Sequence, residues 1–414
     1  MFGNDARRLA IRLTVAASAA TATLWGLTGT AVAAPAAPAV GTISGTGVEG
    51  AIPGSYIVVL EPGTPAADRA ASTSQELVAR YGGKVAGNYL SSVRGFHLEA
   101  TADEAARLAA DPSVSFVEQD AVIDGKALAA PAAPLTQSRK VAWGLDRLDQ
   151  RSLPLSKTYT YKSASAVTAY VIDTGVRTSH KEFGGRATSG WDFVDGDATA
   201  NDCNGHGTHV AGTIGGATYG VAKDVKIVGL RVLGCDGSGS FSDFIAAIDW
   251  VTANAKMPAV ANMSLGGPRS KALDAAVQRS VAKGVTYAIA AGNEDKNGCK
   301  SSPAAAPDAI TVGAVDSADR RADFSNWGTC LDIFAPGVDI VSAAKGSDTG
   351  TKKMSGTSMA APHVAGAAAL VLAAHPDWTP RQVRDDLVAN AGVDLVKDPG
   401  KGSPNRLLYT GHLL

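Results

Sequence analysis

Alternation of two hydrophobic patterns over residues 143–409 constrains the fold most strongly. Near-continuous apolar, β-branched runs predict strands, and segments with helical periodicity stand between them. The expected strands are 167–173, 226–232, 260–265, 285–290 and 310–315, and the expected helices are 242–254, 271–283, 358–375 and 379–390. Strands that are apolar on both sides are typical of a parallel sheet covered by helices. We therefore predict an α/β domain with a doubly wound parallel sheet, whose site lies at the carboxyl ends of the strands.

A smaller unit precedes this domain, between Ala/Pro-rich stretches at residues 34–40 and 129–134. Its pattern predicts a strand at 56–60, a helix at 66–81, a strand ending near Leu98, a helix at 102–110 and a strand at 114–118. This βαββαβ-like order is a ferredoxin-like α+β arrangement. Ala/Pro-rich stretches form extended linkers that proteases cut readily, so we expect this unit to be separable.

The first 33 residues have the organisation of an export signal. Arg7, Arg8 and Arg12 precede an apolar stretch over residues 13–27, and Ala31-Val32-Ala33 has the small residues of a cleavage site. A membrane anchor is the alternative, but Thr, Ser and Gly interrupt a stretch that is short for spanning a bilayer. The two adjacent arginines also fit a twin-arginine signal, although their neighbours favour the general secretory route. We expect a secreted, extracellular protein without stable membrane association.

Composition excludes some classes of function. The net charge of −1 argues against electrostatic binding of nucleic acid. Four cysteines in 414 residues are too few for a disulfide scaffold, and none stands in a Cys-x-x-Cys metal or redox motif. Export would place them in an oxidising compartment where they can pair, but the sequence leaves all three connectivities open.

Three separate stretches carry the residues of nucleophilic acyl transfer. Ser358 stands where an Ala-rich helix begins, a place where unpaired N–H groups and the helix dipole favour an oxyanion. Asp173 ends a strand-like run, and His206 lies in a Gly-rich stretch that opens another helix. A Ser nucleophile needs a base for its proton and a carboxylate that fixes the tautomer of the base. Ser358 alone would be a helix N-cap, but the order Asp, His, Ser is one of those known for this chemistry.

The stretches 167–175, 204–212 and 356–366 resemble the catalytic motifs of subtilisin-like serine peptidases (subtilases), in the proteinase K branch and especially the aqualysin-type secreted enzymes. The similarity extends from Trp143 to Tyr409. It implies a serine endopeptidase that cleaves proteins and peptides through an acyl-enzyme, with Asp173, His206 and Ser358 as the triad. It also implies a propeptide at residues 34–134, with an inhibitor-like domain at about 54–124, and a monomeric catalytic domain at 135–414. The propeptide would inhibit its own enzyme and be removed by it.

The same resemblance assigns the remaining parts of the site. Asn293, which could otherwise be a turn residue, would donate to the oxyanion together with the backbone N–H of Ser358. Two Gly/Ser-rich segments would be the walls of the substrate cleft, namely Gly237, Ser238 and Gly239, and Ser264, Leu265 and Gly266. No acidic residue is visible at the base of the S1 wall, so we expect broad specificity with apolar or aromatic side chains preferred at P1.

Disulfides and calcium are also implied by the resemblance. It pairs the cysteines as Cys203–Cys235 and Cys299–Cys330. Calcium, which takes six to eight oxygen ligands, would be structural, and no catalytic cofactor is expected. One calcium site would use the carbonyls of Pro307 and Ala309 and the carboxylate of Asp332. A second would use Asp146, Asp149, Gln150, Ser156 and Thr158. In both cases ordinary solvated surface charges are the alternative.

Other functions can be weighed against this interpretation. His206 and His209 could be paired metal ligands one helical turn apart, but no Glu accompanies them as in His-Glu-x-x-His enzymes, and no third ligand cluster is evident in the sequence. His209 is therefore expected to pack behind the site. An esterase of the α/β-hydrolase type would have a Gly-x-Ser-x-Gly elbow and another chain order. A non-catalytic inhibitor or binding protein would lack part of the triad, whereas all its parts are present.

Overall fold

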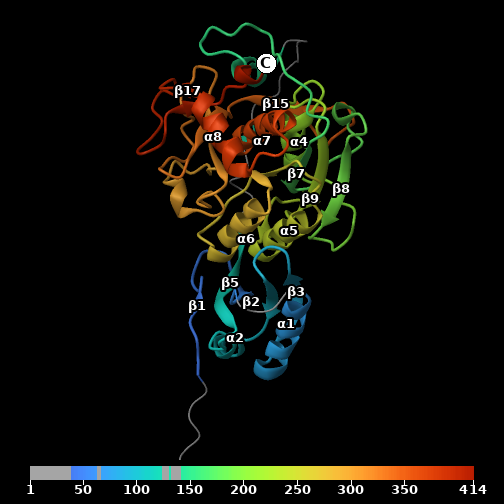
Figure 1. Ribbon diagram of the computed structural model, residues 1–414, viewed down its shortest axis with the longest axis vertical. Coiled ribbons are helices and arrows are strands. Elements are labelled where there is room, and N and C mark those ends of the chain that lie inside the picture. Colours follow the sequence, from blue (N-terminus) through green and yellow to red (C-terminus); the bar gives the residue numbers. More distant parts are fainter. Residues whose placement is uncertain (1–38, 63–66, 124–129, 132–140) are drawn as a thin grey trace, which may run out of the picture. The chain divides into compact units, whose positions relative to one another are not determined.

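The computed structural model describes residues 39–62, 67–123, 130–131 and 141–414 (Figure 1). The predicted export signal and most of the Ala/Pro-rich linker before the catalytic domain lie outside the described residues. Residues 39–414 group into one compact unit. It contains a small sheet with its own core and a large sheet with a core on each face.

The small domain is a sheet with two helices packed on it. Its strands are β1 (Ile43–Ser44), β2 (Ala51–Leu60), β3 (Lys84–Tyr89), β4 (Gly95–Glu99) and β5 (Val114–Ile123), in the order β1-β5-β2-β4-β3. Helices α1 (Ala67–Tyr81) and α2 (Ala102–Leu108) contribute to a core with β2, β4 and β5. A capping box between Thr101 and Glu104 fixes the start of α2. The chain order β2-α1-β3-β4-α2-β5 confirms the predicted ferredoxin-like arrangement.

The large sheet has nine strands in the order β17-β18-β14-β13-β12-β11-β7-β9-β8. All neighbours are parallel except β17 and β18. From β7 the chain fills one side of the sheet with β8 and β9 and the other side from β11 onward, so the doubly wound prediction is confirmed. The bounds are β7 (Thr168–Asp173), β8 (Ala187–Asp192), β9 (Lys226–Arg231), β11 (Ala259–Met263), β12 (Thr286–Ala290), β13 (Ile310–Val315), β14 (Ile333–Pro336), β17 (Gly392–Val393) and β18 (Arg406–Leu407).

Helices cover both faces of this sheet because its strands are apolar on both faces. Val171 of β7 belongs to the core under α4 (His206–Gly215), α7 (Thr357–Ala374) and α8 (Pro380–Asn390). Its neighbour Ile172 belongs to the opposite core, under α5 (Phe241–Asn254) and α6 (Lys271–Ala282). Figure 1 shows α5 and α6 on one side of β7 and β9 and α4 and α7 on the other. Among the described residues α7 is long and apolar enough to span a membrane, but 89% of it is buried in the fold, as expected for a core helix.

Several short elements were not predicted. They are α3 (Trp143–Leu148), β10 (Gly239–Ser240), β14 inside the large sheet, β15 (Ile340–Ala343), β16 (Thr351–Ser355) and β6 (Ala130–Pro131), in addition to the strands at the sheet edges. Two residues of the stretch predicted to be an extended linker form a strand. Pro131 lies opposite Met354 and Ala130 opposite Ser355 in an antiparallel pair with β16.

Candidate active site

The carboxylate of Asp173 and the imidazole of His206 meet at the carboxyl edge of the large sheet. Asp173 is the last residue of β7 and His206 the first of α4, and Asp173 Oδ1 lies 2.7 Å from His206 Nδ1. Both side chains are buried, and the backbone N–H of Thr174 also donates to Asp173 Oδ1. The carboxylate favours the tautomer with the proton on Nδ1, which makes Nε2 the basic nitrogen of the ring.

Glycines allow α4 to begin directly against the end of β7. Gly205 precedes the helix with a φ of 111°, a conformation that glycine adopts without strain. A Cβ atom on Gly207 would lie 2.1 Å from the carbonyl oxygen of Gly175 and 3.2 Å from Asp173 Oδ1. The glycines around His206 therefore serve the close approach of two backbones.

A third carboxylate, that of Asp202, connects the two segments. Asp202 Oδ1 accepts hydrogen bonds from Thr174 Oγ1 at 2.9 Å and from the backbone N–H groups of Asn204 and Gly205 at 2.9 and 2.6 Å. Its Oδ2 accepts from the N–H and hydroxyl of Thr208 at 2.9 and 2.5 Å. Asp202 thus anchors the first turn of α4 to the residue that follows Asp173. We did not predict this residue, because a single Asp in a loop carries no distinct sequence signal.

Ser358 lies at the same edge of the sheet. It is the second residue of α7 and is buried, and its Oγ donates to the carbonyl of Ser264 at 3.1 Å. In return, Ser264 Oγ donates to the carbonyl of Ser358 at 2.9 Å. Ser264 directly follows β11, the neighbour of β7, in which Met263 lies opposite Ile172. Ser358 therefore lies at the end of β11, and β11 is the immediate neighbour of β7, which carries Asp173.

Asn293 also lies next to the start of α7. It follows β12 by three residues, and its Oδ1 accepts hydrogen bonds from the N–H of Thr357 at 2.8 Å and from its hydroxyl at 2.9 Å. Because Oδ1 faces Thr357, the Nδ2 group is at the opposite end of the amide. Gly292 precedes it with a φ of 103°. Thr357, which orients Asn293, is another residue that we did not predict.

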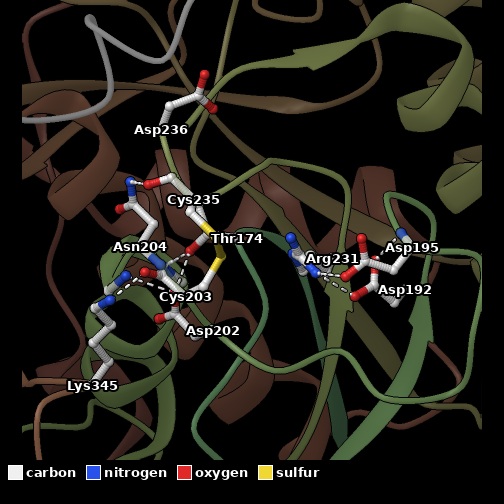
Figure 2. Close-up of a disulfide and its surroundings, with 12 residues drawn as sticks. Thr174, Asp192, Asp195, Asp202, Cys203, Asn204, Arg231, Cys235, Asp236 and Lys345 are labelled. Atoms are coloured by element: carbon white, nitrogen blue, oxygen red, sulfur yellow. Dashed lines mark hydrogen bonds and ion pairs between the residues drawn. A yellow bond between two sulfur atoms is a disulfide. The ribbon is translucent and has the colours of Figure 1, made fainter.

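The first predicted wall is joined to the loop before His206 by a disulfide (Figure 2). Cys235 pairs with Cys203, and Asn204 Nδ2 donates to the carbonyl of Cys235 at 3.0 Å. The segment Gly237–Gly239 follows, with Ser238 held by the carboxylate of Asp236. Figure 2 also shows Arg231, at the end of β9, on one side of Asp192 and Asp195, with both of which it forms ion pairs.

The second predicted disulfide is also present in the structure, and the second predicted wall segment lies beside Ser358. The second disulfide joins Cys299 and Cys330, so both bridges are those that the resemblance implies. In the second wall, Ser264 and Leu265 are buried, and Asn262 Nδ2 donates to Ser264 Oγ at 2.8 Å. Gly266 follows them, beside the antiparallel bridge between Gly267 and Ser302.

The two remaining buried histidines near the site are not arranged for metal binding. His209 Nε2 lies 3.0 Å from the carbonyl oxygens of both Ile340 and Lys352, and burial lowers the pKa of His209 to about 3. His363 Nδ1 contacts the carbonyl of Met359, and burial lowers the pKa of His363 to about 4. Within the described ranges no group of three or more His, Cys, Asp or Glu residues could hold a metal ion. Both rings are neutral packing groups at physiological pH.

The first predicted calcium cluster fits a cation, but an arginine competes for it. Burial raises the pKa of Asp332 to about 6, as for a carboxylate with little compensating charge, and the N–H of Thr311 donates to its Oδ2. Arg384 Nη1 donates to the carbonyl of Pro307 at 2.9 Å, and its positive charge lowers the pKa of Asp332 against the effect of burial. A calcium ion bound by Pro307, Ala309 and Asp332 would compete with this guanidinium for the carbonyl of Pro307.

The second predicted cluster fits calcium less well. Its side chains do come together, but the carboxylate of Asp146 accepts hydrogen bonds from Gln150 Nε2, Ser156 Oγ and the N–H of Lys157. Ser156 Oγ and Thr158 Oγ1 are 2.7 Å apart, and Asp149 turns to the N–H of Thr160. Donors of the chain itself thus satisfy the carboxylates that a cation would need.

Comparison with known proteins decides the family. Residues 164–409 match the Subtilase family, and residues 55–124 match Peptidase inhibitor I9. The chain belongs to the subtilase family. It is a subtilisin-like serine proteinase preceded by an inhibitor-type propeptide domain, as the sequence motifs implied.

Individual relatives support this subtilase assignment along most of the chain. An extracellular serine proteinase of Thermus sp. (strain Rt41A) is 49% identical over 87% of this chain and 90% of its own length. Alkaline serine exoprotease A of Vibrio alginolyticus is 52% identical over 77% of this chain and 59% of its own length. The crystal structure of a cold adapted subtilisin-like serine proteinase matches with a TM-score of 0.64 and 55% identity, over 66% of this chain and 99% of that chain.

Proposed function

We propose that this subtilase is an extracellular endopeptidase in which Ser358 is the nucleophile, His206 the general base and Asp173 the residue that orients the base. The observation that carries the proposal is the meeting of these residues at one edge of the sheet. Asp173 ends β7 and contacts His206 at 2.7 Å, while Ser358 is bonded to Ser264 at the end of the adjacent β11. Parallel sheets present their sites at this edge.

The chemistry would follow from these positions. Ser358 Oγ attacks the peptide carbonyl while its proton passes to His206 Nε2, and His206 then protonates the leaving amine. Water hydrolyses the acyl-enzyme with the same base. The Ser358 hydroxyl has one proton, donated here to Ser264, so the O–H must turn toward His206 Nε2 before attack. The N–H of Ser358 and Nδ2 of Asn293 would stabilise the oxyanion.

The N-terminal domain would inhibit the enzyme until it is cut off. Two pairings support this: Ile123 lies opposite Gly239 of the first wall, and Ala130 lies opposite Ser355, three residues before Ser358. These two described pairings lie at the cleft wall and close to the proposed nucleophile. We expect self-cleavage between Asp124 and Leu135, after export directed by residues 1–33, with a catalytic domain at 135–414.

Specificity and metal dependence complete the proposal. The mature enzyme would act as a monomer on proteins and peptides, with apolar or aromatic side chains at P1. Calcium would be structural, bound first at Asp332 in competition with Arg384, and no catalytic cofactor would take part.

Hydrolysis of casein by the purified mature protein tests the proposal. Wild-type enzyme should release peptides, and a matched Ser358→Ala protein should release none. An enzyme that hydrolyses small esters but not casein would be a different Ser hydrolase. A protein without hydrolytic activity that only binds the N-terminal domain would be a non-catalytic binding module.

A further inference from the structure

Strand β5 of the N-terminal domain binds the catalytic domain through alternate side chains on one of its faces. Phe116, Glu118 and Asp120 are spaced two residues apart, so in a strand they point the same way. Each of them meets the beginning of a catalytic-domain helix. The strand is therefore an example of a polypeptide bound to this surface.

The acidic side chains contact the first turns of two helices. Glu118 Oε2 accepts hydrogen bonds from the N–H groups of Lys271 and Ala272, the first residues of α6, at 2.9 and 3.3 Å. Asp120 Oδ1 accepts from the N–H of Ser242, the second residue of α5, at 3.2 Å. Glu118 and Asp120 are only 4% and 1% exposed, so these carboxylates are fully enclosed.

A cation and an aromatic ring extend the contact. The ammonium group of Lys271 lies 4.1 Å from the centre of the Phe116 ring, a favourable cation–π arrangement. Positive helix ends and a lysine together favour negative charge on the bound strand. Two acids of the helices themselves, Asp243 and Asp274, lie in the same first turns and partly oppose this preference for negative charge. Asp243 accepts a hydrogen bond from Ser240, and Asp274 forms an ion pair with Arg269.

The register relates this surface to the substrate cleft. β5 is antiparallel to β10, with Ile123 opposite Gly239 and Val122 opposite Ser240. Glu118 and Asp120 therefore stand five and three residues upstream of the residue that faces Gly239. A substrate that pairs with Gly239 in the same direction would extend over the same helix ends once the N-terminal domain has left. The N–H groups of Ser242, Lys271 and Ala272 would then need new partners, which substrate carboxylates could provide.

We propose that the first turns of α5 and α6 form an upstream subsite of the mature enzyme, which binds acidic side chains of protein substrates. These side chains would lie three and five residues ahead of the substrate residue that faces Gly239. The inference rests on the proposed peptidase function. It assigns to Ser242, Lys271 and Ala272 a preference that is separate from the apolar preference at P1.

Two matched peptides test the subsite. One has the sequence of residues 116–131 between a fluorophore and a quencher, and the other differs only by Gln for Glu118 and Asn for Asp120. The mature enzyme should cleave the acidic peptide with a KM about three- to tenfold lower and a similar kcat, and 0.5 M NaCl should reduce the ratio. A third peptide keeps Glu118, Asp120 and the residues around the cleaved bond but has an unrelated sequence in the segment that joins them. Its KM should equal that of the first peptide.

Two variants at one position separate the backbone donor from the charge. Lys271→Pro removes both the N–H and the ammonium group at the first position of α6, where proline is tolerated in helices, and should give the largest reduction of the KM ratio of the two peptides, while the N–H groups of Ser242 and Ala272 keep the ratio above one. Lys271→Ala retains the N–H and should give an intermediate ratio. Equal KM values for both peptides in the wild-type enzyme would overturn the subsite alone. Failure to cleave either peptide would instead contradict the proposed peptidase function.

Discussion

Asp202 and Thr174 are joined by a hydrogen bond of 2.9 Å from Thr174 Oγ1 to Asp202 Oδ1. Thr174 follows the acid of the proposed triad, and its Oγ1 in turn accepts from the N–H of Gly207, the neighbour of the base. This pair therefore connects the backbone at Asp173 to the backbone at His206. Since the Asp173–His206 contact is what orients the base, Asp202 acts as a positioning residue for it.

Asp202→Ala should lower kcat by one to two orders of magnitude with a smaller change in KM, because misplaced catalytic groups raise the barrier more than they weaken binding. The kcat of Asp202→Asn should lie between those of the wild type and Asp202→Ala. An amide can still accept at Oδ1, but its NH2 group would face the N–H of Thr208, and two donors cannot form a hydrogen bond. The pH profile of kcat/KM should also shift on its acid side, as the environment of His206 changes. Asp195→Ala, at an exposed acid, is the control. Wild-type kinetics in Asp202→Ala would refute the positioning role.

Asn293→Ala tests the proposed oxyanion hole. In subtilisin, loss of a comparable side-chain donor lowers turnover by about 10²- to 10³-fold, and we expect the same range here with KM nearly unchanged. The change also removes the acceptor for Thr357, so Thr357→Val is measured beside it. Steady-state kinetics on one peptide give both values. A loss confined to KM would contradict an oxyanion role.

Stability at acid pH should depend on His363. Burial lowers its pKa to about 4 in the folded protein, whereas an unfolded histidine has a pKa of about 6.5. The unfolded state therefore binds the proton first, so this stabilising contribution is present above pH 6.5 and is lost as the pH falls toward 4. His209, with its pKa lowered to about 3, acts in the same direction.

Thermal unfolding of the Ser358→Ala protein, which cannot digest itself, measures this effect. Its Tm should fall between pH 7 and pH 4.5, and His363→Leu in the same background should show a smaller fall. Comparing the slopes of Tm against pH in the two proteins removes the general effects of acid, which both proteins share. Identical slopes would show that His363 does not titrate differently in the two states.

Calcium dependence should be set by Arg384. In the wild type the guanidinium is the cation near Asp332 and Pro307, so EDTA should lower Tm only modestly. Arg384→Ala should deepen the effect of EDTA, because calcium would be the remaining counter-charge for the Asp332 carboxylate. Asp332→Asn should reduce the response to calcium in both backgrounds. Activity at 25 °C should hardly change with EDTA, and its immediate loss, restored by zinc, would revive a metallopeptidase interpretation.

The sequence predicted the longer elements that are buried on both sides, and missed those at the edges and the four-residue buried strand β14. The run that ends at Asp173 is largely apolar and buried throughout because helices cover both faces of β7. By contrast, β8 has the sequence Ala-Thr-Ser-Gly-Trp-Asp at the edge of the sheet, where partial exposure allows polar residues. Its pattern is that of a loop, and only its pairing with β9 makes it a strand.

Site residues followed the same logic. Asp173, His206 and Ser358 stand in motifs with glycines that close backbone approach requires, so their proximity could be expected. Asp202 and Arg384 could not, because each acts through a tertiary contact that leaves no local pattern. Asp202 does stand two residues before the Asn-Gly pair that opens α4, which is the one local hint of its role.

The mass of the product secreted from a host without extracellular proteases tests the central claim most directly. Wild-type protein should appear as a catalytic domain of about 280 residues whose N-terminus lies between Asp124 and Leu135, because Ser358 cuts its own chain. The Ser358→Ala protein should remain joined to the N-terminal domain. A Ser358→Ala product that matures at the wild-type rate and to the same mass would contradict Ser358 as the nucleophile of self-processing.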